Sequence, residues 1–236
     1  MIYIIMNLFC IIGLGVFTYL LFRLNTKSKF SVMPFFFSGL IIIASDILLT
    51  LALFMSIIEN EYFIRLLIRI SLGLEGAFIV FYCFGFLENR ENNINDNLEM
   101  IKYVLSGLAL FSCWLFCNDI IVSFDSGILI GSKRIFLNQS NKLTWYSLYS
   151  YMYTIIIPGF CAVFSLFLNK EKSFFTKKYK TLILIGLLLI FFTLSKFLSY
   201  RFIQLNFIKM LNYLILMFIL YLFIRKEIST QSENKK

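Results

Sequence analysis

The sequence predicts an all-α, polytopic membrane protein: a seven-transmembrane helix bundle with its N-terminus outside and its C-terminus inside the cell. Of the 236 residues, 60% are hydrophobic and only 15% are charged, whereas soluble domains carry about 25% charged residues. The apolar residues form separate blocks of roughly 20, the length that takes a helix across ~30 Å of hydrocarbon. Basic residues gather in alternate connections between these blocks. We therefore expect a multi-pass protein of the cell membrane.

Seven apolar blocks define the predicted spans, and their length favours helices over the alternating strands of a membrane barrel. The first block lacks the basic start and the cleavage site of a signal peptide. The second is longer than a perpendicular span and should tilt. Together the spans form one membrane domain, residues 1–224, followed by polar residues 225–236, which we expect to be a disordered cytoplasmic tail. The blocks cover residues 2–22, 32–58, 64–86, 101–124, 146–168, 181–200 and 205–224.

The orientation follows from the Lys and Arg residues in the short connections. With the N-terminus outside, fourteen of them lie on the inner side and six on the outer side, while Lys196 and Lys209 lie within spans. Attraction between this basic inner surface and anionic lipids also explains the net charge of +9. No nucleic-acid partner is implied.

The residue inventory argues against catalysis. The chain contains no His, which removes His-based acid–base chemistry and His-containing zinc or haem sites. All five Cys lie within apolar blocks and imply no disulfide framework. We therefore expect no enzyme activity, no cofactor and no metal.

The longest outer connection lies between the fourth and fifth spans. Two short apolar runs in it, residues 127–131 and 134–138, flank the turn-forming Gly131 and Ser132. This pattern predicts a small hairpin that covers the outer end of the bundle. The sequon at Asn138 faces outside, but the Ile-, Asn-, Lys- and Phe-rich composition suggests a bacterial chain and argues against glycosylation.

Six charged residues lie inside predicted spans, where charge is costly and usually functional. They are Asp46, Arg69, Glu75, Asp119, Lys196 and Lys209. The alternating direction of the spans places Asp46 and Glu75 near mid-membrane and the other four in the outer half. We predict that all but Asp46 face a polar cavity open to the outside. One alternative is that these residues form structural ion pairs between helices, and another is that Arg69 and Lys209 only reach the outer interface.

Glu75 lies among small residues, Gly73, Gly76 and Ala77, which permit close helix approach. We expect Glu75 to be a protonated hydrogen-bond donor packed between helices, with a proton relay as the alternative. Pro158, in the fifth span, should free a backbone carbonyl and kink its helix.

Aromatic residues crowd the outer start of the fifth span, where Trp and Tyr commonly mark the headgroup region. Tyr146, Tyr149 and Tyr153 share one helix face, and their phenols could line a ligand pocket. We therefore add Tyr149 and Tyr153 to the candidate ligand-binding residues. An ordinary aromatic belt is the alternative.

Three local features accompany the seven-span plan: an aromatic stretch at residues 143–151, a basic inner segment at 177–180 and a Gly-containing apolar run at 185–187. With these features the chain resembles the seven-helix N-terminal membrane region of some bacterial sensor histidine kinases. The resemblance implies sensing of a small molecule or lipid from the outer side. No kinase follows residue 224, so it also implies a separate signalling partner that docks on the basic loop at residues 170–180.

Two other functions stay open. A small seven-helix transporter or channel would explain the buried charges, but the first and last three spans show no convincing repeat. An immunity or accessory subunit of another membrane complex fits the same architecture. A retinal protein is disfavoured because Lys209 lies close to the outer end of its span, rather than deep within it.

Overall fold

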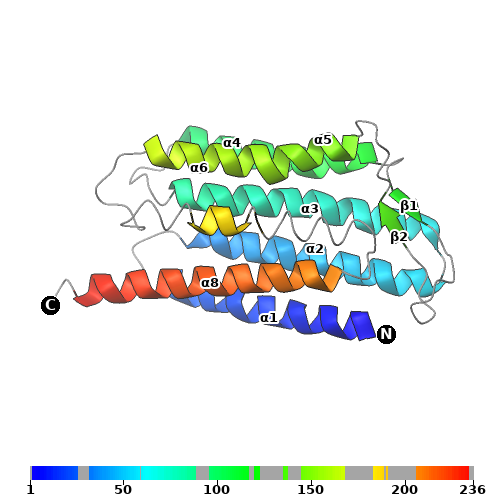
Figure 1. The fold of residues 1–236 in the computed structure, drawn as a ribbon, viewed down its shortest axis with the longest axis horizontal. Helices are drawn as coiled ribbons and strands as arrows, with labels where there is room; N and C mark the ends of the chain where they lie inside the picture. The colour runs from blue at the N-terminus through cyan, green and yellow to red at the C-terminus, as the bar shows by residue number, and fades with distance from the viewer. Residues whose placement is uncertain are drawn as a thin grey trace.

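A computed structural model shows a bundle of long helices that run side by side along one axis (Figure 1). Within the described residues the chain is almost entirely helical, apart from two three-residue strands. The start of α1 and the two strands lie at one end of the bundle, which we call the hairpin end. We call the opposite end the C-terminal end. The structure describes residues 2–25, 32–58, 60–88, 96–116, 120–122, 135–137, 145–167, 183–188, 190 and 206–233.

Among the described residues, four helices are long and apolar enough to cross a membrane: α1 (Ile2–Asn25), α2 (Met33–Ile58), α3 (Glu61–Glu88) and α8 (Asn206–Glu233). They correspond to the first, second, third and seventh predicted blocks. Polar side chains fix two of their ends. The Val32 amide donates to Asn25 Oδ1 at 3.0 Å, linking α1 to α2, and the Phe63 amide donates to Asn60 Oδ1 at 3.2 Å, capping α3.

The helix α3 lies at the centre of the bundle (Figure 1). On one side it packs against α2, and on the other against α4 (Asp96–Ser112) and α6 (Ile157–Phe167), while α1 packs against α2 and α8. In the most apolar stretch of α3, 83% of the residues are buried, compared with 28% in α1 and 39% in α8. The peripheral helices therefore expose much apolar surface, the distribution expected of a bundle surrounded by lipid.

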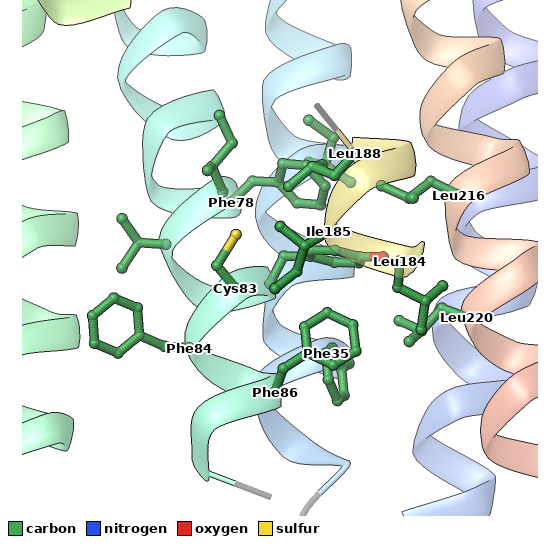
Figure 2. Close-up of a cluster of buried hydrophobic side chains, with 14 of the residues drawn as sticks. Phe35, Phe78, Cys83, Phe84, Phe86, Leu184, Ile185, Leu188, Leu216 and Leu220 are labelled. Atoms are coloured by element: carbon green, nitrogen blue, oxygen red, sulfur yellow. The ribbon is translucent and has the colours of Figure 1, made fainter. Parts of the chain in front are cut away.

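Two hydrophobic clusters fill the interior. The larger extends toward the C-terminal end and draws side chains from α1, α2, α3, α8 and the helical residues 183–188 (Figure 2). Its aromatic centre consists of Phe35, Phe78, Tyr82 and Phe86. The rings that contact one another have centroids 4.9–6.0 Å apart. The smaller cluster lies nearer the hairpin end. Its buried members are Cys10, Leu49, Ala52, Leu53, Ile64, Ile68, Leu72 and Met210.

The fourth predicted span, residues 101–124, is wrong at its second half. The helix α4 ends at Ser112 and is followed by a 3-10 turn, η1 (Cys113–Phe116), and then by a strand, β1 (Ile120–Val122). Hydropathy does not separate a short run of β-branched residues in a strand from the end of an apolar helix, since both are equally apolar.

A hairpin is present, with a different first strand. The strand β2 (Ile135–Leu137) lies within the predicted second strand and pairs antiparallel with β1, so that Ile121 lies opposite Phe136. The predicted first strand, residues 127–131, lies outside the described residues. The hairpin therefore begins within the fourth predicted block, after α4 and η1 have ended.

The fifth predicted span contains the irregularity expected from Pro158. The helix α5 (Trp145–Tyr151) passes through a π-helical turn, η2 (Met152–Ile156), before α6 begins. In this turn the Ile157 amide donates to the Met152 carbonyl, five residues back. Proline has no amide hydrogen to offer the preceding turn, and a π turn takes up the mismatch locally.

The last two predicted segments have different outcomes. Of the sixth predicted span, residues 181–200, the structure describes only 183–188 and 190. The helix α8 continues to Glu233, so residues 225–233 are helical rather than a disordered tail. No Gly or Pro interrupts residues 206–233, and the Ser229 hydroxyl donates to the Lys226 carbonyl at 2.8 Å. The polar composition of residues 225–233 therefore did not indicate where the helix ends.

Candidate functional site

A buried ion pair joins α3 to α8. The Lys209 ammonium donates to the Glu75 carboxylate, and each side chain is only 7% exposed. Glu75 occupies the middle of α3, whereas Lys209 lies in the first turn of α8. The two residues can meet because α8 begins part-way along the bundle rather than level with the hairpin end of α3 (Figure 1). Two charges that would each be costly in the interior compensate one another here.

This pair corrects one sequence prediction. Glu75 accepts a hydrogen bond from an ammonium, rather than donating one as a protonated acid. Lys209 contacts the middle of α3, and its place in the outer half of the membrane stays a prediction. The predicted start of the last block was close to that of α8, but a hydropathy pattern carries no information on how far a helix is displaced along its neighbours.

Asp46, on α2, is the third charged group of the site. Its side chain is fully buried, and neither carboxyl oxygen has a hydrogen-bond partner among the described residues. It lies within electrostatic reach of Glu75 and Lys209, and of Cys10 on α1. We call Asp46, Glu75 and Lys209 the charge cluster. It draws one charged residue from each of α2, α3 and α8.

Hydroxyl groups beside the charge cluster bind α2 to α3. The Ser45 hydroxyl lies 2.8 Å from the Ser71 hydroxyl and donates to the Ser71 carbonyl at 3.0 Å, one turn before Glu75. The Thr50 hydroxyl donates to the backbone carbonyl of Asp46 at 2.8 Å. The bonds between Ser45 and Ser71 hold α2 against α3 beside the two carboxyl groups, whereas the Thr50 bond lies within α2.

Asn7 adds an uncharged polar side chain from α1. It is fully buried, and both of its amide atoms are without a hydrogen-bond partner among the described residues. Gly13 faces Leu214, because a Cβ at Gly13 would lie 2.7 Å from Leu214 Cδ1. Since α1 and α8 run in the same direction (Figure 1), this register places Asn7 level with Lys209. Asn7 thus brings a polar side chain from a fourth helix to the level of Lys209.

Asp46 and Glu75 lie where the two hydrophobic clusters meet. On α2, Asp46 follows the larger cluster and precedes Leu49 of the smaller one, and on α3 Glu75 lies between Leu72 and the larger cluster. Apolar side chains therefore enclose the charges from both ends of the bundle. Electrostatic interactions are stronger in such surroundings than in water.

The phenols of Tyr149 and Tyr153 both point into the bundle, as the shared helix face predicts. Tyr149 donates to the Leu72 carbonyl of α3 at 2.6 Å, and Tyr153 donates to the Leu105 carbonyl of α4 at 2.8 Å. Their ring centroids lie 4.6 Å apart. Both phenol hydrogens are thus bound to backbone carbonyls. A ligand-binding role for the two residues stays a prediction.

Gly76 makes room for one of these phenols. A Cβ at this position would meet the Tyr149 hydroxyl and would lie 2.9 Å from the Cβ of Ala109 on α4. The close helix approach predicted from the small residues around Glu75 is therefore confirmed at Gly76, where α3, α4 and α5 meet.

The other predicted site residues lie apart or are not described. Arg69 is partly buried and lies nearer the hairpin end of α3. One turn before it, Arg65 forms a surface ion pair with Glu61 of the same helix. Asp119 and Lys196 lie outside the described residues. The structure therefore unites Glu75 with Lys209, and the predicted outer cavity as a whole stays a prediction.

Three residues were missed or misplaced by sequence reasoning. Asp46 was left out of the predicted cavity, and Asn7 was not considered, although its spacing places it on the buried face of α1. Lys102 was one of the fourteen basic residues counted on the inner side. It is instead buried in α4, with its ammonium 5.4 Å from the Phe81 ring centroid and 4.9 Å from that of Tyr103. A lysine followed at once by an aromatic residue near the start of an apolar block was the available signal.

The chain matches no protein-family model and no curated protein. The chemistry of the site must therefore be inferred from its own residues. Among the described residues, no group of three His, Cys, Asp or Glu side chains could hold a metal ion. The charge cluster contains two carboxyl groups within reach of one ammonium. In such a site the ammonium can pair with either carboxylate, and the other carboxyl group can hold a proton.

Proposed function

We propose that this chain is a seven-span protein of the cell membrane, with its N-terminus outside, that serves as a ligand-sensing or accessory module and acts through a separate partner. The buried ion pair between Glu75 and Lys209 carries the proposal. Charge inside an apolar bundle is costly and marks functional sites by default. The resemblance to the sensor regions of histidine kinases supports sensing over transport, and no catalysis by the chain itself is proposed.

The position of α8 suggests how a signal would leave the bundle. This helix packs along α1 and meets α3 at the ion pair and at the Phe78–Tyr213 ring contact, whose centroids lie 5.1 Å apart. It also extends past the ends of α1, α2 and α3 at the C-terminal end (Figure 1). Beyond Ile224 this extension is roughly 14 Å long. A ligand that alters the ion pair would shift α8 against α3, and the extension would present that shift to a partner.

Site-specific photo-crosslinking in cells tests this proposal. A photoreactive residue in place of the exposed Ser229, on the extension of α8, should trap one discrete partner protein. The same residue in place of the exposed Tyr19, on α1, serves as the matched control and should not. Adduct formation at Ser229 should weaken in Lys209→Met. Equal labelling from both positions, or no protein adduct at Ser229, would contradict a partner-dependent role.

A small transporter is the second candidate, and Asp46 is the observation that favours it. A fully buried carboxyl group without a hydrogen-bond partner among the described residues is also what an ion-coupled transporter requires. Reconstitution of the purified chain into liposomes separates the two functions. A sensing or accessory module should move no solute. Solute flux that is lost in Lys209→Met and Glu75→Gln would replace our proposal with transport.

A further inference from the structure

The charges of the cluster do not balance among the described residues. Asp46 and Glu75 supply two carboxyl groups, and Lys209 supplies one ammonium. We infer that Asp46, Glu75 and Lys209 form a proton-binding site, in which Asp46 carries the exchangeable proton and the Lys209 ammonium pairs with whichever carboxyl group is ionised. This inference goes beyond the proposed function and holds for a sensor, an accessory subunit or a transporter alike.

The two carboxyl groups have different surroundings, which decides where the proton lies. The Glu75 carboxylate accepts a charge-assisted hydrogen bond from Lys209. The Asp46 carboxyl oxygens, fully buried, accept no hydrogen bond from any described residue. An isolated buried carboxylate is unfavourable and takes up a proton instead. In the arrangement seen here, Glu75 is therefore the ionised group and Asp46 the neutral one.

The remaining groups around Asp46 do not alter this assignment. The charged or titratable side chains that face it from the described residues are Cys10 on α1, Glu75 on α3 and Lys209 on α8. Cys10 is an uncharged thiol in an apolar cluster and supplies no compensating charge. Among these described groups only Lys209 can serve as a counter-ion, and it is engaged by Glu75.

A proton fits this site better than a metal cation such as Na⁺. Sodium sites in membrane proteins use several oxygen ligands, commonly including carbonyls of unwound helices. Here α2 is continuous from Met33 to Ile58 and therefore offers no unwound carbonyls. The Lys209 ammonium would also repel a second cation. A proton needs no ligand set and neutralises Asp46 directly.

Transfer of the proton from Asp46 to Glu75 would reorganise the cluster. The Asp46 carboxylic acid releases one proton to water and becomes a carboxylate, which then competes with Glu75 for the Lys209 ammonium. If the ammonium moves to Asp46, the abandoned Glu75 carboxylate takes up one proton in turn. The net change is a transfer of α8 from an ion pair with α3 to an ion pair with α2. Proton binding at Asp46 thus selects the helix to which α8 is bound.

Infrared difference spectroscopy of the purified chain in phosphatidylcholine vesicles, titrated with acid and base, tests the inference. The wild type should show the carbonyl band of a protonated carboxylic acid at neutral pH, and Asp46→Asn should lack it. Glu61→Gln, which changes an exposed and ion-paired carboxylate of α3, is the matched control and should retain the band. Asp46→Glu keeps the acid group and should shift the band, so the test does not depend on one variant that folds.

Two outcomes would overturn the inference. The band could persist in Asp46→Asn, which would place the proton on another group. It could also appear only when Na⁺ is removed, which would indicate a cation site.

A second measurement follows from linkage. Folding takes up a proton if Asp46 is neutral in the folded chain and ionised in the unfolded one, so the stability of the wild type should fall as the pH rises above about 4, where the unfolded Asp side chain ionises. The stability of Asp46→Asn should show less of this pH dependence, and an unchanged dependence would contradict the site.

Discussion

Gly76 determines how closely α3, α4 and α5 approach, and its replacement by Ala tests that contact. The added methyl group would lie 2.9 Å from the Ala109 Cβ and would displace the Tyr149 hydroxyl from the Leu72 carbonyl. Overpacking of this kind costs about 1–3 kcal/mol, and the lost hydrogen bond adds to the cost. We expect Gly76→Ala to lower the free energy of unfolding in detergent accordingly.

Gly107→Ala is the matched control for this variant. Gly107 lies on the neighbouring helix α4, and a Cβ there meets no atom within 4 Å. Since Ala favours a helix over Gly by about 1 kcal/mol, this variant should be neutral or slightly stabilised. Equal losses in the two variants would show that glycine acts through helix flexibility rather than through contact.

Residue type alone identified Glu75, Lys209 and Asp46 as candidate functional residues, because charge inside an apolar segment is costly. It did not identify which charges pair. Lys102 shows the limit most clearly, because a lysine near the start of an apolar block can lie in solvent or be buried over aromatic rings. Its position between Phe81 and Tyr103 depends on how α4 packs against α3, which no local pattern encodes.

Among the elements, the hairpin offers the sharpest test of register. Ile121 lies opposite Phe136 in the β1–β2 pair, whereas Leu137 lies opposite Ile120. In a chain whose five native cysteines are replaced by serine, Cys at positions 121 and 136 should form a disulfide under mild oxidation. The control pair, Cys at 121 and 137, should form it more slowly, because a one-residue offset turns the side chains to opposite faces of the hairpin. Faster cross-linking of the control pair would contradict the register.

The elements that the sequence predicts well are those whose pattern is long. Blocks of twenty or more apolar residues located α1, α2, α3 and most of α8. The end of α4 and the start of β1 fall inside one apolar block, where hydropathy has the same sign for both. The sequence predicted a kink at Pro158. It did not predict a π turn, because that form depends on which carbonyls the amides after Met152 bond to.

For the whole molecule, the seven-span topology is a prediction that reporter fusions can test. The excess of basic residues in alternate connections predicts that fusions at Lys29, Asn92, Lys172 and Lys236 all report the cytoplasm, and that a fusion at Lys142 reports the outside. An outside signal from the Lys236 fusion, or a cytoplasmic one from Lys142, would contradict the topology. The Asn92 and Lys142 fusions matter most, because they bracket the block that ends in a hairpin.

The arrangement of helices across the molecule could not be predicted from the sequence. Each helix was visible as an apolar block, but the central position of α3 and the displacement of α8 along the bundle arise from packing between distant segments. That displacement is what brings Lys209 to Glu75. The sequence therefore identified the three charged residues of the cluster, but it could not show that Lys209 pairs with Glu75.

The central claim is that the Glu75–Lys209 ion pair holds α8 to α3 in the interior, and a double-mutant cycle in detergent-solubilised protein tests it most directly. Lys209→Met leaves Glu75 without its counter-ion and should cost about 3–5 kcal/mol of unfolding free energy. Glu75→Gln should cost less, because Asp46 can ionise and take over Lys209.

The double variant, which removes both charges, should be more stable than Lys209→Met alone. Glu61→Gln, at the exposed pair with Arg65, should cost no more than about 1 kcal/mol and calibrates the measurement. A double variant more stable than Lys209→Met is the result that the buried pair predicts. A double variant whose loss equals the sum of the two single losses would show that the charges act independently and would contradict the account.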